Sequence, residues 1–205
     1  MTEHEIREIV ETQRKFFYTG AVLDVDYRMQ ALKKLQSCIL KYENEINDAI
    51  KKDLGKSAFE SYMCETGLVL SEISYMLKHI RKFSKEKTVL TPLAHFHSRS
   101  FKKPSPYGVV LIMSPWNYPF LLTIDPLVDA IAAGNTAVVK PSAYSPNTSE
   151  IMKKLIEECF DKEYVALVTG GRAENTCLLN EHFDYIFFTG SQTVGKEVMK
   201  CASSH

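Results

Sequence analysis

The chain has 205 residues, of which 45% are hydrophobic and 24% are charged, as in an ordinary globular protein. It carries 25 basic and 25 acidic residues, so no net field attracts nucleic acid or an anionic membrane, and neither is expected as a partner. The five cysteines show no C-x-x-C spacing, the first residues are charged, and apolar runs end well before the ~20 residues that span a bilayer. We therefore expect a reducing, cytoplasmic setting and no membrane segment.

Residues 1–86 are predicted to be helical. Apolar residues recur at helical spacing through residues 26–54, with Asp26 as the expected N-cap and Gly55 just past the end. A second amphipathic run covers residues 60–87 and has a basic tail. We interpret that tail as a solvated helix end, with a binding patch as the alternative.

Residues 87–106 have an irregular pattern, which indicates a linker or an edge strand. His95 and His97 lie two residues apart, a spacing that places both on one side of a strand, as in some metal sites. No third ligand of suitable spacing stands nearby, so no metal site is predicted.

Residues 107–205 alternate between strand and helix signals. Short, nearly continuous apolar strands separated by helical stretches are typical of a parallel sheet with helices on both faces, so the predicted fold class is α/β and Rossmann-like. The strand signals are "GVVLIMS", "TAVVKPS", "YVALVTGG" and "FDYIFFTG"; the helix signals are "DPLVDAIAAG", "SPNTSEIMKKLIEECF", "NTCLLNE" and "QTVGKEVMKCASS".

Ligands of open parallel sheets bind at the carboxyl ends of the strands, where "SPWNYP", "KPSAYSP", "TGGRAE" and "TGSQTVG" follow the four strands. The last of these joins a strand to a helix through Gly190 and Gly195, an arrangement that binds phosphate at a helix N-terminus. Glycines that only form a tight turn are the alternative, and the spacing departs from GxGxxG.

Two further side chains have a functional and a structural interpretation. Lys140 ends a buried strand and could bind sugar hydroxyls or a phosphate, or could be a surface lysine at the strand end. Asn117 lies between two prolines that restrict the backbone, so its amide could donate to a developing oxyanion, or could simply favour the turn.

The segments "PYGVVLIMSPWNYPF", "AIAAGNTAVVKPS" and "FDYIFFTGSQTVGKEVMKCAS" resemble the NAD(P)-dependent aldehyde dehydrogenase superfamily, and "GGRAENTCLL" is most similar to its class 3 or fatty-aldehyde branch. The resemblance covers essentially the whole chain as the N-terminal part of such an enzyme. It implies oxidation of an aldehyde to a carboxylic acid by a cysteine nucleophile, a glutamate-activated water and NAD or NADP. It also implies a homo-oligomeric longer protein.

The resemblance assigns roles by position. Asn117 corresponds to the oxyanion donor, Lys140 to the ribose-binding lysine, residues 190–195 to the turn that contacts the pyrophosphate, and Val194 to the residue beside the adenine. The full set of expected cofactor-binding residues is Ser114, Pro115, Trp116, Lys140, Ser142, Gly170, Gly190, Ser191, Val194 and Gly195.

The sequence departs from the family pattern in two places. Ala143 stands where many members have a glutamate that binds ribose hydroxyls, so NADP should not be strongly excluded. The 205 residues end before the family's "ELGGK" and nucleophile segments, and the five cysteines are interpreted as packing residues. We therefore expect a cofactor-binding part that is inactive alone; a non-catalytic dinucleotide-binding or interaction module is the alternative.

Overall fold

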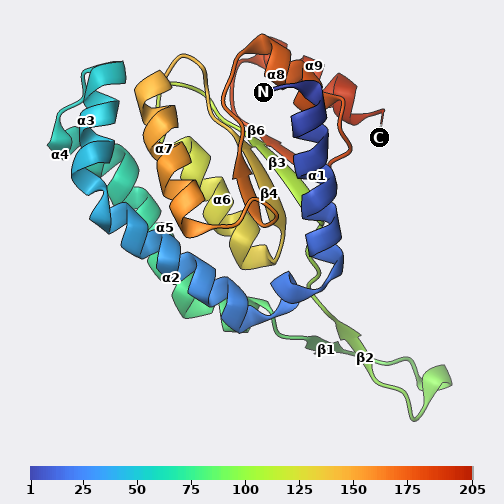
Figure 1. The fold of residues 1–205 in the computed structure, drawn as a ribbon. Coiled ribbons are helices and arrows are strands. Elements are labelled where there is room, and N and C mark those ends of the chain that lie inside the picture. Colours follow the sequence, from blue (N-terminus) through green and yellow to red (C-terminus); the bar gives the residue numbers. More distant parts are fainter. Residues whose placement is uncertain (205) are drawn as a thin grey trace.

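The computed structural model describes residues 1–204 and shows an α/β fold, as predicted. A four-stranded parallel sheet lies at the centre, with helices on both faces and a small hairpin projecting from the body (Figure 1). The helices before the sheet are α1 (Glu3–Tyr18), α2 (Val25–Lys41), α3 (Glu43–Leu54), α4 (Ala58–Ser61) and α5 (Gly67–Phe83), with a 3-10 turn η1 (Ala21–Leu23) and a π-helical segment η2 (Tyr62–Thr66).

The helix predicted over residues 26–54 is two helices, because the chain turns at Tyr42 between α2 and α3. The expected N-cap was also wrong: Asp24, not Asp26, caps α2, and its side chain accepts a hydrogen bond from the backbone N–H of Asp26 at 2.9 Å. Gly55 ends α3 in the left-handed conformation with φ 73°, as expected for a helix C-cap.

Residues 87–106 contain a two-stranded antiparallel hairpin that stands away from the body (Figure 1). It consists of β1 (Lys87–Val89) and β2 (Ser100–Lys102), joined through a 3-10 turn η3 (Leu93–His95). Among residues 1–204, no group of histidine, cysteine, aspartate or glutamate side chains is arranged to hold a metal ion.

The parallel sheet has the order β5-β4-β3-β6, so the chain starts in the middle and adds strands outward on both sides. Met113 pairs with Lys140 on one side and with Phe188 on the other, which aligns the carboxyl ends of β3, β4 and β6. The strands are β3 (Val109–Met113), β4 (Thr136–Lys140), β5 (Val165–Leu167) and β6 (Tyr185–Phe188), and the helices between and after them are α6 (Leu121–Ala133), α7 (Pro146–Cys159), α8 (Arg172–Leu179) and α9 (Gln192–Ala202).

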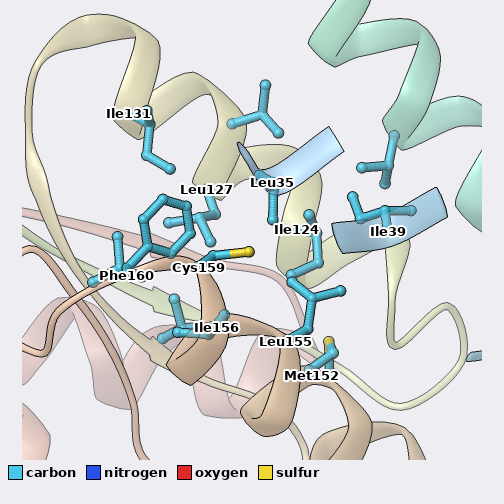
Figure 2. Close-up of a cluster of buried hydrophobic side chains, with 14 of the residues drawn as sticks. Leu35, Ile39, Ile124, Leu127, Ile131, Met152, Leu155, Ile156, Cys159 and Phe160 are labelled. Atoms are coloured by element: carbon cyan, nitrogen blue, oxygen red, sulfur yellow. The ribbon is translucent and has the colours of Figure 1, made fainter. Parts of the chain in front are cut away.

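Alternate residues of β3 pack into two separate hydrophobic clusters because neighbouring side chains of a strand point to opposite faces. Val110 and Ile112 contribute to the cluster beneath α2, α3, α5, α6 and α7. Figure 2 shows part of that cluster, where α2, α6 and α7 meet. Leu111 contributes to the second cluster, which lies under α1, α8 and α9 on the other face.

Helix α1 therefore covers a different face of the sheet from the other N-terminal helices, a division that the helical pattern of residues 1–86 did not predict (Figure 1). The buried Gln13 side chain donates to the backbone carbonyl of Ala137 in β4 at 2.8 Å. Arg14 forms an ion pair with Asp184, just before β6, at 3.0 Å. These contacts attach the first helix to the sheet. Within residues 1–204, no helix combines the length and apolar character needed to cross a bilayer.

Candidate functional site

The carboxyl ends of the parallel strands and the loops that follow them line a groove of about 690 Å³. The predicted residues that line it are Ser114, Pro115, Trp116, Lys140, Ser142, Gly170, Gly190, Ser191 and Val194. Gly195 does not line the groove; it lies in the first turns of α9, with Phe188 beside it. The structure thus brings together side chains that are distant in the sequence, as the strand-end rule predicts.

Lys140 is buried, with 3% of its surface exposed, so the interpretation as a surface lysine is wrong. Its ammonium donates to the backbone carbonyls of Pro141 and Gly170, both at 2.8 Å. Burial lowers the pKa of Lys140 to about 8, and the nearby Glu174 carboxylate partly opposes that shift. Because the two carbonyls use only part of the ammonium's donor capacity, another N–H remains for a ligand in the groove.

The N-terminus of α9 forms the part of the groove that follows β6. The Ser191 side chain caps this helix by accepting from the backbone N–H of Val194 at 3.4 Å. The first N–H groups of a helix have no acceptor within the helix, so those of Gln192 and Thr193 are available to a ligand. Together with the helix dipole, they favour a phosphate or another anion at this end of the groove.

The other helix N-terminus at the groove, that of α8, is already occupied by its own side chain. Glu174, the third residue of α8, accepts from the backbone N–H of Gly171, the N-cap residue, at 2.7 Å. Backbone N–H groups of Glu174 and Gly171 hold the pKa of the Glu174 carboxyl below its ordinary value. A carboxylate at this end of the groove makes α9, and not α8, the site suited to an anion.

Two predicted hydroxyls have partners inside the protein. Ser114 shares a hydrogen bond of 2.5 Å with Thr123, and its backbone N–H donates to the carbonyl of Lys140 at 3.2 Å. Ser142 accepts from the backbone N–H of Tyr144 at 3.2 Å. These contacts order the loops after β3 and β4 where they form the wall of the groove.

Asn117 lies in the loop between β3 and α6, one residue beyond Trp116, and is exposed. Trp116 lines the groove and Asn117 does not, so the candidate oxyanion donor lies next to the groove rather than within it. The backbone carbonyl of Asn117 accepts a hydrogen bond from Lys56 at 3.0 Å. The loop is thus attached to the segment before α4, which no motif in the sequence indicated.

Thr193 and Arg172 line the groove and belong to the predicted segments "TGSQTVG" and "TGGRAE". The groove also contains residues outside those segments, among them Glu197 and Cys201. These two lie four and eight residues beyond Thr193 on α9, a spacing that places all three on one face of the helix, so this signal was readable once the helix was assigned. Cys38 and Cys159 are buried, in agreement with their interpretation as packing residues.

Comparison with known proteins gives an independent result. The model of the aldehyde dehydrogenase family matches residues 1–205. A 4,4'-diaponeurosporen-aldehyde dehydrogenase of Staphylococcus aureus is 45% identical over 94% of this chain and 42% of its own length. Aldehyde dehydrogenase family 3 member A2 of Mus musculus is 41% identical over 94% of this chain and 40% of its own length.

The fold agrees with these sequences. A solved structure titled as the substrate-bound state of Staphylococcus aureus AldH has a TM-score of 0.95 and 44% identity, covering 97% of this chain and 43% of its own. The chain thus spans about 40% of the length of the relatives that it matches. The match of the family model to the whole chain and the class 3-like relatives establish that this chain belongs to the aldehyde dehydrogenase family.

Proposed function

We propose that this chain is the cofactor-binding part of an enzyme that oxidises an aldehyde to a carboxylic acid with NAD or NADP. The observation that carries the proposal is the groove itself, in which a buried lysine and an open helix N-terminus lie together at the carboxyl ends of the parallel strands. This donor set fits a dinucleotide, which has sugar hydroxyls and a pyrophosphate.

In this proposal, the residues of the groove have separate tasks. The remaining N–H of Lys140 donates to a ribose hydroxyl, and the first N–H groups of α9 donate to the pyrophosphate oxygens. Val194, which is 45% exposed in the groove, packs against the adenine side. Ser114, Pro115, Trp116, Ser142, Gly170, Gly190, Ser191 and Gly195 shape or support this surface. When bound, the nicotinamide accepts the hydride that the oxidation releases.

Asn117 has a different task in the proposal. Its amide N–H₂ donates to the aldehyde oxygen as negative charge develops there, which lowers the energy of the transition state. Its position beside the groove, next to Trp116, is suited to a group that acts on the substrate rather than on the cofactor. We infer that the substrate is an aldehyde, and that a longer protein containing this chain is a homo-oligomer.

The cofactor preference follows from Ala143. A carboxylate at this position would bind ribose hydroxyls and repel a 2′-phosphate, and alanine does neither. NAD and NADP should therefore bind with affinities that differ by less than about a hundredfold, or 2.7 kcal/mol. An affinity for NAD that is about a hundredfold or more above the affinity for NADP would contradict the inference.

Calorimetric titration of the 205-residue chain with NAD and with NADP tests the proposal. Binding of either cofactor that is lost when α9 residues or Lys140 are substituted would support the groove as the site. Absence of binding at millimolar cofactor would refute it. The same chain should not turn over aldehydes, and measurable reduction of NAD with an aliphatic or aromatic aldehyde would show that it is a complete catalyst.

A further inference from the structure

A π-helical segment, η2, separates α4 from α5 and carries the buried carboxylate of Glu65, which is 0% exposed. The backbone N–H of Gly67 donates to the carbonyl of Tyr62, five residues earlier, which defines the π turn. A Cβ at Gly67 would lie 2.6 Å from that carbonyl oxygen, so a larger residue would displace the backbone. The local winding that directs Glu65 inward therefore depends on glycine.

Glu65 contacts the N-terminus of α6. One carboxylate oxygen accepts from the backbone N–H of Phe120 at 2.8 Å and from that of Leu121 at 3.3 Å. The N-cap of α6 is Phe120, which provides no side-chain cap of its own. Glu65 thus supplies the cap from another helix, with a negative charge at the positive end of the helix dipole.

Lys56 connects the same carboxylate to Asn117. Its ammonium lies 2.7 Å from the second oxygen of Glu65 and donates to the backbone carbonyl of Asn117 at 3.0 Å. It also lies 4.0 Å from the centre of the Tyr118 ring, within the range of a cation–π contact. The loop that carries Asn117 is therefore bound at Asn117 by Lys56 and at its end, where α6 begins, by Glu65.

A buried ion pair contributes little to stability compared with well-packed apolar residues, because both charges lose their hydration. The side chains of Lys56 and Glu65 are only 11% and 0% exposed, so this cost applies to both. Directional hydrogen bonds to a loop give the pair a role that apolar residues cannot fill.

We propose that Lys56 and Glu65 are positioning residues that order the loop of residues 114–120 and so hold the Asn117 amide in place. The proposal rests on the oxyanion role inferred for Asn117 above. It adds that two buried charged side chains outside the groove hold Asn117 in position for this role: Lys56 in the loop before α4, and Glu65 in the π-helical segment.

The experiment compares Lys56→Met and Glu65→Gln with matched substitutions in an exposed pair. Lys154 and Glu45 form such a pair at 2.7 Å, with side chains 50% and 53% exposed, so Lys154→Met and Glu45→Gln are the controls. All variants are made in the 205-residue chain, without cofactor. The readouts are the side-chain amide signals of Asn117 in NMR spectra, assigned with Asn117→Asp, and the fluorescence anisotropy of Trp116, the only tryptophan.

We expect Lys56→Met and Glu65→Gln to broaden the Asn117 amide signals by about twofold or split them, and to lower the Trp116 anisotropy, because the loop samples more conformations. The controls should match the unsubstituted chain. Folded Lys56→Met and Glu65→Gln proteins whose Asn117 and Trp116 signals stay within the spread of the controls would overturn the proposal.

Two measurements keep the test decisive if a single variant fails to fold. The double variant Lys56→Met/Glu65→Gln leaves no unpaired buried charge, and the same signals are compared in it. In the unsubstituted chain, hydrogen exchange at Phe120 and Leu121 should be as slow as in the middle of α6, although first-turn amides ordinarily exchange fast. Fast exchange there would refute the contact with Glu65. No readout involves cofactor, so a failure of cofactor binding would leave this result unaffected. In the same way, a failure of the proposal for Lys56 and Glu65 would leave the cofactor titrations unaffected.

Discussion

Replacing Lys140 with methionine removes a buried ammonium that lines the groove while keeping a side chain of similar length and apolar stem. In the structure, this ammonium donates to the carbonyls of Pro141 and Gly170 at 2.8 Å and, in the proposed function, to a ribose hydroxyl. A hydrogen bond from a charged group contributes about 1.5–3 kcal/mol. Loss of the bond to the cofactor should therefore weaken NAD binding by about 10-fold to 100-fold.

The same variant has a stability effect whose sign depends on pH. Burial lowers the pKa of Lys140 from 10.5 to about 8, so the unfolded chain binds more protons between these two values. The cost of burying the charge is complete below pH 8 and is relieved as the pH rises toward 10.5. A shift of this size corresponds to about 3 kcal/mol. The free energy of unfolding of the unsubstituted chain should therefore rise, relative to Lys140→Met, across this pH window.

The assays are calorimetric titration with NAD at pH 7 and urea unfolding between pH 7 and pH 10.5. Lys154→Met is the control, because Lys154 is exposed and lies on α7, outside the groove. It should not change the NAD affinity. The ion pair with Glu45 raises the pKa of Lys154, so this substitution should not remove the rise in the free energy of unfolding above pH 8. A folded Lys140→Met protein that binds NAD within about twofold of the unsubstituted chain would refute the assignment of Lys140 as a cofactor ligand.

Three further predictions test other parts of the structure. A Cβ added at Gly190 would lie 2.5 Å from the ring of Phe188, whereas a Cβ added at Gly195 would lie 3.4 Å from the same ring. Gly190→Ala should therefore lower the free energy of unfolding by about 1–3 kcal/mol, and Gly195→Ala should not lower it. Equal urea midpoints for the two variants would contradict this prediction. Desolvation, with nearby Glu72 and Asp125, raises the pKa of Asp129 to about 6, so its ionisation costs stability as the pH rises from about 4 to 6. Asp129→Asn should raise the thermal midpoint at pH 8 but not at pH 4. The gain in the free energy of unfolding should be less than about 1 kcal/mol, because water screens this exposed group; a larger gain at pH 4 would show the sign to be wrong. The edge strand β6 exposes 38% of Phe187, so Phe187→Lys should reduce any self-association seen by sedimentation, and an unchanged distribution of species would exclude that edge.

Much of the fold follows from local sequence patterns. The apolar runs of β3 and β4 are buried along their whole length, as expected for central parallel strands. Since such strands end at one edge of the sheet, their loops were expected to meet, and Lys140 and Gly190 do line one groove. Periodicity and the alternation of strand and helix signals are properties of the chain itself, so they could be read without a structure.

Other features depend on contacts between residues that are distant in the sequence. The helical prediction for residues 1–86 included α1 but did not indicate that it covers the opposite face of the sheet from α2, because either face offers it an apolar surface. Lys56 and Glu65 had no recognisable motif, since a charged residue in a helical pattern is ordinarily solvated; burial and the approach of α6 make them partners of Asn117. The sequence alone identified many of the residues that line the groove, such as Lys140 and Gly190. Only the tertiary structure decided which buried charges lie against the neighbouring loop, because that choice depends on desolvation and on distances between separate elements.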